Sequence, residues 1–256
     1  MSAAGTSRVL VRHPSAVLLV VQLCGVLLYP YTEDTTWGRY VFEVFGALVL
    51  GLAVWSVRSS PTPTWISLIL GVGASALSVA DAVTPSPTLA VVSAALHAVF
   101  YFWAAGNLMA YMLADTDVTK DELYAVGATF TLLAWAFAYV YTVLQTFQPG
   151  CFTAAVDPGG QRTWLELLFL SFTNLSSTGL SDVVPITAVA RSVVMIQQLA
   201  GLGYVALFVS RLVGLTLARR QAAAAPSAGT PAPSAGTPAP SVGTPVPPLG
   251  GERDRG

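Results

Sequence analysis

Apolar residues occur along the chain in long blocks that are separated by short polar connectors. A bilayer core is about 30 Å thick and needs about 20 mostly apolar residues per helix. Blocks of this length predict six membrane-spanning helices, at residues 14–31, 40–57, 65–83, 88–113, 123–146 and 186–217. Between the fifth and sixth lies a shorter apolar stretch, Trp164 to Leu175. At about 1.5 Å per residue it is too short to cross as a helix, and we expect it to enter the membrane and turn back.

The connectors support this division because they carry residues that stop helices or charges that avoid lipid. They read "YTEDTTWGR", "RSSPTPT", "DAVTPSP", "DTDVTKDE" and "FQPGCFTAAVDPGGQR". Composition agrees: 54% of the residues are hydrophobic and only 10% are charged, too few to cover the surface of a soluble domain of this size. The sequence therefore predicts an all-α membrane protein. Its net charge of −1 gives no sign of nucleic-acid binding.

Lys and Arg favour one orientation in the membrane. If both termini are cytoplasmic, that side receives Arg8, Arg12, Arg58, Lys120, Arg211, Arg219 and Arg220, and the outside receives Arg39, Arg162 and Arg191. This bias follows the positive-inside rule. The first block follows two arginines, but no small-residue cleavage site comes after it, so we interpret it as an uncleaved helix. We expect a multi-pass plasma-membrane protein.

The chain changes character after Arg220. The near-repeat "PSAGTPAPSAGTPAPSVGTPVPP" cannot bury a core. We therefore expect a disordered cytoplasmic tail at 221–256, open to an unknown cytoplasmic partner. The predicted organisation is a four-helix transmembrane region at 1–118, a pore domain at 119–220 and this tail.

Few side chains offer enzymatic or metal chemistry. His13 and His97 lie far apart in the sequence, and we interpret His97 as a packed or hydrogen-bonded helix residue. Glu43 and Asp81 lie at predicted span ends, where we give them structural roles, with proton or ion relay as the alternative. The sequence shows no paired intramembrane carboxylates and no broken-helix repeat. We expect no enzyme and no cofactor other than a permeant monovalent cation.

One polar segment interrupts the apolar sequence, "SFTNLSSTGLSDVVP" at 171–185. A helix that ends inside a membrane leaves carbonyls unsatisfied, and irregular backbone is tolerated there only against protein or water. The helix before it has a start signal, because Thr163 and Glu166 fit a capping box. Its C-terminal end directs partial negative charge toward the membrane centre, which favours a cation. The pattern predicts a hydrated cation site.

These residues resemble a known family. The segment from Trp164 to Leu215 resembles the pore module of the tetrameric potassium-channel superfamily, a two-transmembrane ion channel domain with a re-entrant pore helix and a filter. The usual filter reads T-T-L-T-T-V-G-Y-G-D, then a hydrophobic residue, any residue and Pro. The chain matches it in register at Thr173, Leu175, Gly179, Asp182, Val183 and Pro185. The resemblance implies a homotetramer, because one filter strand per chain cannot form a ring.

The resemblance also implies roles for individual residues. The ion-conducting filter would consist of Ser177, Thr178, Gly179, Leu180 and Ser181. K⁺ would bind the backbone carbonyls of Ser177, Thr178 and Gly179 and the Ser177 hydroxyl. Asp182 would lie at the outer mouth, unless it pairs with Arg191 or Arg162. Gly201 would be the hinge of the inner helix, unless it only permits close packing.

The filter departs from the family pattern, because it reads STGLSD in place of TVGYGD. Leu180 lacks the tyrosine hydroxyl that ties the filter to its surroundings, and Ser181 replaces the second glycine. "STGLS" is also similar to the single-glycine filters of Trk-type potassium transporters, which carry four such repeats in one chain. We expect a K⁺-conducting channel with weakened discrimination between K⁺ and Na⁺. The alternative is a non-conducting, pore-like membrane subunit or sensor.

Gating is the least specified property. Residues 88–113 contain neither Lys nor Arg, so we expect no voltage sensing by a charged fourth helix. Lipid, the acidic linker "DTDVTKDE", a partner protein and the filter itself remain as gating elements.

Overall fold

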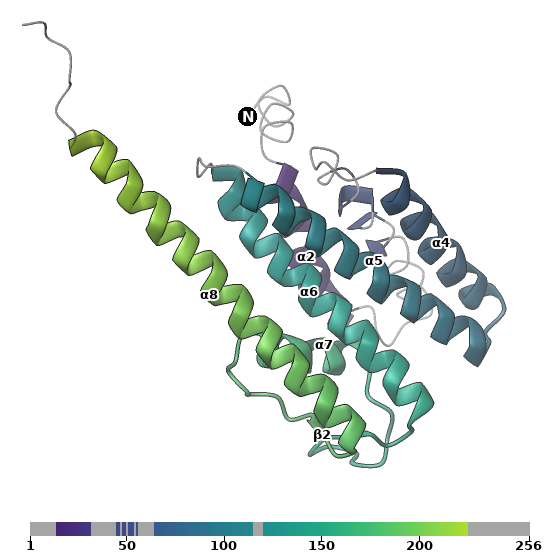
Figure 1. Ribbon diagram of the computed structural model, residues 1–256. Helices are drawn as coiled ribbons and strands as arrows, with labels where there is room; N and C mark the ends of the chain where they lie inside the picture. Colours follow the sequence, from purple (N-terminus) through teal and green to yellow (C-terminus); the bar gives the residue numbers. More distant parts are fainter. Residues whose placement is uncertain are drawn as a thin grey trace, which may run out of the picture. The chain divides into compact units, whose positions relative to one another are not determined.

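A computed structural model of the chain describes residues 14–31, 64–114 and 120–224, together with positions 45, 46, 48, 49, 51–53 and 55. The chain divides into two units, Met1–Leu217 and Ala218–Gly256, and the fold below is that of the first. Its elements are α2 (Pro14–Leu28), η1 (Tyr29–Tyr31), α4 (Thr64–Val83), α5 (Pro87–Ala114), α6 (Lys120–Phe147), β1 (Phe152–Thr153), α7 (Trp164–Leu175), β2 (Val184–Pro185) and α8 (Ala188–Ala224) (Figure 1).

Within the described residues, five helices are long and apolar enough to cross a membrane. They are Pro14–Tyr31, Trp65–Val83, Pro87–Ala114, Asp121–Phe147 and Ala188–Gly214. Each corresponds to a predicted span, which confirms a mostly helical membrane protein. The remaining predicted span, 40–57, falls largely outside the described residues. The predicted tail also lies there, except that α8 continues to Ala224 and so includes residues 221–224.

Aromatic side chains join the long helices to the short helix α7. Tyr101 of α5 meets Trp135 of α6 edge-on, with ring centroids 5.6 Å apart. Trp135 in turn meets Trp164, the first residue of α7, edge-on at 5.4 Å. Both Tyr101 and Trp135 are fully buried, and edge-to-face contacts are a favoured aromatic geometry. The start of α7 is therefore fixed against the core of the helical unit.

His97 belongs to the same aromatic region. Its ring stacks on Tyr139 with centroids 4.7 Å apart, and its Nδ1 lies 2.9 Å from the Ser93 carbonyl oxygen one turn earlier. The interpretation of His97 as a packed helix residue is confirmed.

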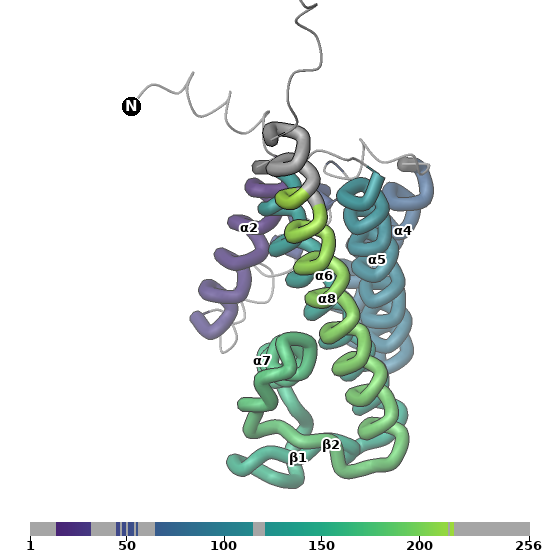
Figure 2. The backbone as a smooth tube through the Cα atoms, turned by 60° about the vertical axis from the view of Figure 1, so that its left-hand side comes forward, coloured from purple at the N-terminus to yellow at the C-terminus, as the bar shows by residue number. Residues whose placement is uncertain are grey.

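A small antiparallel sheet lies at the end of the unit where α8 begins (Figure 2). Phe152 pairs with Pro185 and Thr153 with Val184. The preceding residue, Cys151, is buried, and its carbonyl accepts a 2.9 Å hydrogen bond from the Ile186 amide. Burial raises the pKa of the Cys151 thiol, which keeps it protonated near neutral pH. The sheet ties the loop before α7 to the segment that follows the predicted filter.

Candidate functional site

The start of α7 is held by side chains as well as by packing. Thr163 and Glu166 form the predicted capping box: the Thr163 hydroxyl accepts from the Glu166 amide at 3.3 Å, and the Glu166 carboxylate accepts from the Thr163 amide at 2.6 Å. The Arg162 guanidinium is buried and pairs with the Glu166 carboxylate at 3.3 Å. It also donates to the carbonyls of Val156 and Gly160. The outer loop and the first turn of α7 therefore form one hydrogen-bonded structure.

At the other end of α7 the backbone turns sharply. Ser177 and Gly179 both have left-handed backbone angles, with φ of 59° and 64°. Such angles are uncommon for a residue other than glycine. The turn directs the amides of Thr178 and Gly179 back to one acceptor, the carbonyl of Thr173, at 2.9 and 3.2 Å. A helix-terminal carbonyl is thereby satisfied by donors from the segment that follows.

The same turn sets the direction of the filter carbonyls. In a trans peptide group the C=O and N–H point in opposite directions, and the peptide bonds of this segment are trans. Because the amides of Thr178 and Gly179 point at the Thr173 carbonyl, the carbonyls in the same peptide groups, those of Ser177 and Thr178, point away from it. Two of the predicted cation ligands thus face away from the end of α7.

The filter segment and the inner helix share one hollow of about 440 Å³. Its lining residues are Thr173, Ser177, Gly179, Gln198, Leu199 and Leu202. The side of α8 at this level is exposed in the single chain, as are Ser177, Thr178 and Gly179. The structure therefore brings two predicted site residues, Ser177 and Gly179, and an exposed face of α8 to a common open space.

Comparison with known proteins found one family model that matches the part of the chain that contains this site. Residues 127–217 match the family model described as "Ion channel". The match supports an ion-channel family for α6, α7, the filter segment and α8, and it leaves out the helices before α6. Neither the curated proteins nor the solved structures contain a match to the chain.

The residues predicted to form the outer part of the filter, Leu180 and Ser181, follow the two amides that are bonded to the Thr173 carbonyl. The Leu180 side chain is 77% exposed. The Ser181 hydroxyl accepts a 3.1 Å hydrogen bond from the Val183 amide, a local turn of the kind serine favours. Val183 is buried and leads into β2. The chain is thus fixed again only after Ser181.

Asp182, predicted to lie at the outer mouth, is exposed. The two arginines weighed as its ion-pair partners have other contacts. Arg162 pairs with Glu166, and the Arg191 Nε donates to the Pro185 carbonyl at 3.2 Å. The role of Asp182 at the outer mouth stays a prediction.

Gly201 has a packing role in the structure. It is buried in α8, which is helical on both sides of it. A Cβ atom added at Gly201 would collide with the backbone carbonyl of Leu175, the last residue of α7. An added Cβ at Gly203 would meet nothing within 4 Å. Close packing explains the glycine at 201, and its hinge role stays a prediction.

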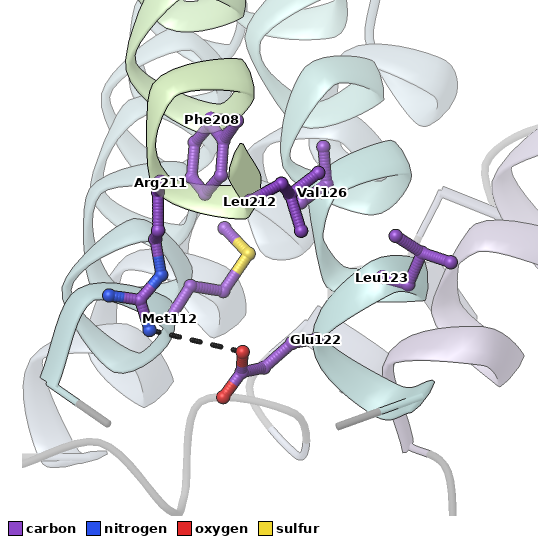
Figure 3. A pocket seen from close by; sticks show the side chains of 7 residues that line it. All are labelled: Met112, Glu122, Leu123, Val126, Phe208, Arg211 and Leu212. Atoms are coloured by element: carbon purple, nitrogen blue, oxygen red, sulfur yellow. Dashed lines mark ion pairs between the residues drawn. The ribbon is translucent and has the colours of Figure 1, made fainter. Parts of the chain in front are cut away.

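The inner end of α8 contacts the start of α6 (Figure 3). The Arg211 guanidinium lies 3.9 Å from the Glu122 carboxylate, and the apolar side chains of Met112 and Phe208 line the same small pocket. The neighbouring Asp121 accepts from the amide and hydroxyl of Ser15 at the start of α2, at 3.3 and 2.9 Å. The last residues of the acidic linker therefore contact both the first described helix and the inner helix.

Three buried polar residues behind the filter were missed by sequence reasoning: Tyr141, Ser171 and Gln197. They come from α6, α7 and α8, so no local spacing joins them. The available signal was Gln197, an amide in the middle of an apolar span, where polar side chains are costly unless they are hydrogen-bonded.

Proposed function

We propose that the chain forms a homotetrameric cation channel whose filter is Ser177 to Ser181. The observation that carries the proposal is the orientation of two peptide groups, Ser177–Thr178 and Thr178–Gly179. Their carbonyls point away from α7, on a segment that is exposed in the single chain. Backbone carbonyls in a ring can replace the hydration shell of a monovalent cation.

Four copies together supply enough carbonyl ligands for a cation, whereas one copy does not. One chain offers one carbonyl per layer of the filter, and a dehydrated cation needs several. An exposed apolar face along α8 supports self-association, because large uncovered apolar surfaces mark interfaces with protein or lipid. Its most exposed members include Met195, Ile196, Leu199 and Leu202. Closed symmetry then places four filters around one axis.

We propose K⁺ as the main permeant ion, with weak discrimination against Na⁺. The inner filter is held by hydrogen bonds to Thr173, whereas Leu180 has no hydroxyl with which to anchor the outer filter. Asp182 at the outer mouth would raise the local cation concentration. The absence of Lys and Arg from residues 88–113 supports gating without a charged fourth helix.

A non-conducting subunit or sensor is the second candidate, and one observation favours it. Leu180 carries a large, mostly exposed apolar side chain next to the filter. Four leucines around one axis would form a hydrophobic constriction, and such constrictions can close a pore by dewetting.

The first experiment combines native mass spectrometry of the detergent-solubilised protein with K⁺ flux into liposomes. We expect a tetramer and a flux that depends on the protein. A monomer or dimer that conducts would contradict the tetramer, and a tetramer without flux would favour the second candidate.

A further inference from the structure

Four hydrogen bonds behind the filter form a closed path through three helices. The Tyr141 hydroxyl of α6 donates to Gln197 Oε1 of α8. Gln197 Nε2 donates to the Ser171 hydroxyl and carbonyl of α7, at 2.6 and 3.1 Å. The Ser171 hydroxyl donates to the Ala134 carbonyl of α6 at 2.6 Å. The path begins and ends on α6.

The donors and acceptors leave one consistent arrangement for the Gln197 amide. A carbonyl can only accept, so the group beside the Ser171 carbonyl must be Nε2. The Oε1 atom is then the acceptor for Tyr141. The Ser171 hydroxyl accepts from Gln197 and uses its own hydrogen for Ala134. Each of these polar side-chain groups therefore has a partner.

All three side chains are completely buried, with 0% exposure for Tyr141, Ser171 and Gln197. A buried donor or acceptor that loses its partner keeps its desolvation cost. Rotation or sliding of α7 would break several of these bonds together. The path therefore fixes the position of α7 relative to both long helices.

The position of α7 in turn determines the position of the filter. Ser171 and Thr173 belong to the same turn of α7, and the Thr173 carbonyl accepts from the amides of Thr178 and Gly179. A displacement of α7 would move that carbonyl and re-aim the carbonyls of Ser177 and Thr178. The adjacent glutamine, Gln198, has a different environment, because it is exposed and lines the hollow.

We infer that Gln197 is a positioning residue of the filter, and that it acts with Tyr141 through Ser171. This inference rests on the proposed channel function. In this view the hydrogen bonds of Ser171 on α7 anchor the filter. Leu180 cannot anchor the outer filter in this way, because its side chain has no hydrogen-bonding group. Gln197 acts through α7 and does not touch the permeant ion.

The chain offers a matched control for the test. Tyr204 of α8 also donates its hydroxyl across the α6–α8 contact, to the Val126 carbonyl at 2.6 Å. Tyr141→Phe and Tyr204→Phe each remove one buried hydroxyl between the same two helices. Only the first hydroxyl is connected to α7. A general loss of packing would affect the two variants alike, and a loss of positioning would affect only Tyr141→Phe.

The experiment measures amide hydrogen exchange in residues 171–181 of the purified full-length protein, alongside the K⁺/Na⁺ permeability ratio in liposomes. For Tyr141→Phe we expect exchange about tenfold faster, the order of change for one lost buried hydrogen bond. For Gln197→Leu, which removes three of the four bonds, we expect a larger acceleration. We also expect a permeability ratio closer to one and an unchanged oligomeric state. Tyr204→Phe should match the parent in both readouts.

Equal exchange in parent, Tyr141→Phe and Gln197→Leu would overturn the inference, and so would an equal acceleration in Tyr204→Phe. If Gln197→Leu does not fold, the comparison of the two tyrosine variants decides. A parent protein that passes no cations would refute the proposed function, whereas hydrogen exchange would still decide the role of Gln197.

Discussion

At the scale of single residues, two positive backbone angles set the direction of the carbonyls in the predicted filter. Gly179 adopts its left-handed angle without a side chain, whereas Ser177 adopts the same region with one. A non-glycine residue there costs of order 1 kcal/mol. Hydrogen bonds to the Thr173 carbonyl offset that cost: it accepts from the amides of Thr178 and Gly179, and the hydroxyls of Ser176 and Thr178 lie 3.3 Å from the same oxygen. The hydroxyl-rich sequence thus holds the turn that orients the carbonyls.

Two glycines of α8 give a prediction at this scale. Gly201→Ala should lower the dissociation temperature of the purified oligomer, because the new Cβ collides with the rigid backbone of Leu175. Gly203→Ala should leave that temperature unchanged or raise it, since Ala favours a helix over Gly by about 1 kcal/mol and the space is open. Size-exclusion chromatography of samples heated to increasing temperatures measures the dissociation temperature of each variant. Equal destabilisation by both substitutions would contradict the packing role.

At the scale of helices, sequence alone predicted α7 well. Its bounds, Trp164 to Leu175, follow from a capping box at one end and a polar Ser-Ser-Thr-Gly run at the other, and both signals are local. The five described spans follow from hydrophobic length in the same way. The hydrogen bonds of Gln197 could not be predicted, because their partners lie on two other helices, α6 and α7, and depend on how the three helices are rotated. The contact of Gly201 with Leu175 is equally non-local.

The ion pair between Glu122 and Arg211 gives a prediction for α6 and α8. If α8 lines the pore axis and α6 lies outside it, this pair holds the inner end of α8 away from the axis. Glu122→Gln and Arg211→Gln should each lower the open probability about fivefold, the effect of about 1 kcal/mol on a two-state equilibrium. Single-channel recording in planar bilayers measures this.

A charge swap is the control for that prediction. The double variant Glu122→Arg with Arg211→Glu restores opposite charges at the same positions, so its open probability should lie closer to the parent than either single substitution. Single variants with the open probability of the parent would show that the pair does not bear on gating.

At the scale of the whole molecule, the matched region contains the predicted filter and an exposed apolar face of α8. The match spans residues 127–217, from α6 to α8, and in one chain the filter residues Ser177 to Gly179 and the α8 residues Leu199 and Leu202 are exposed. Among the described residues, α2 and α5 pack on α6, and none that precedes α6 lines the hollow. Under the proposed function, four copies of the matched region would conduct together.

The most direct test of that account is the reversal potential of the purified protein in planar bilayers, with K⁺ on one side and Na⁺ at equal concentration on the other. We expect a current whose reversal potential is displaced from zero only modestly, in the direction that indicates a preference for K⁺. The double variant Leu180→Tyr with Ser181→Gly should displace it further, because it restores the ring hydroxyl and the second glycine. A strongly K⁺-selective reversal potential in the unmodified protein would contradict the loosely held outer filter, and the absence of current from both proteins would contradict conduction itself.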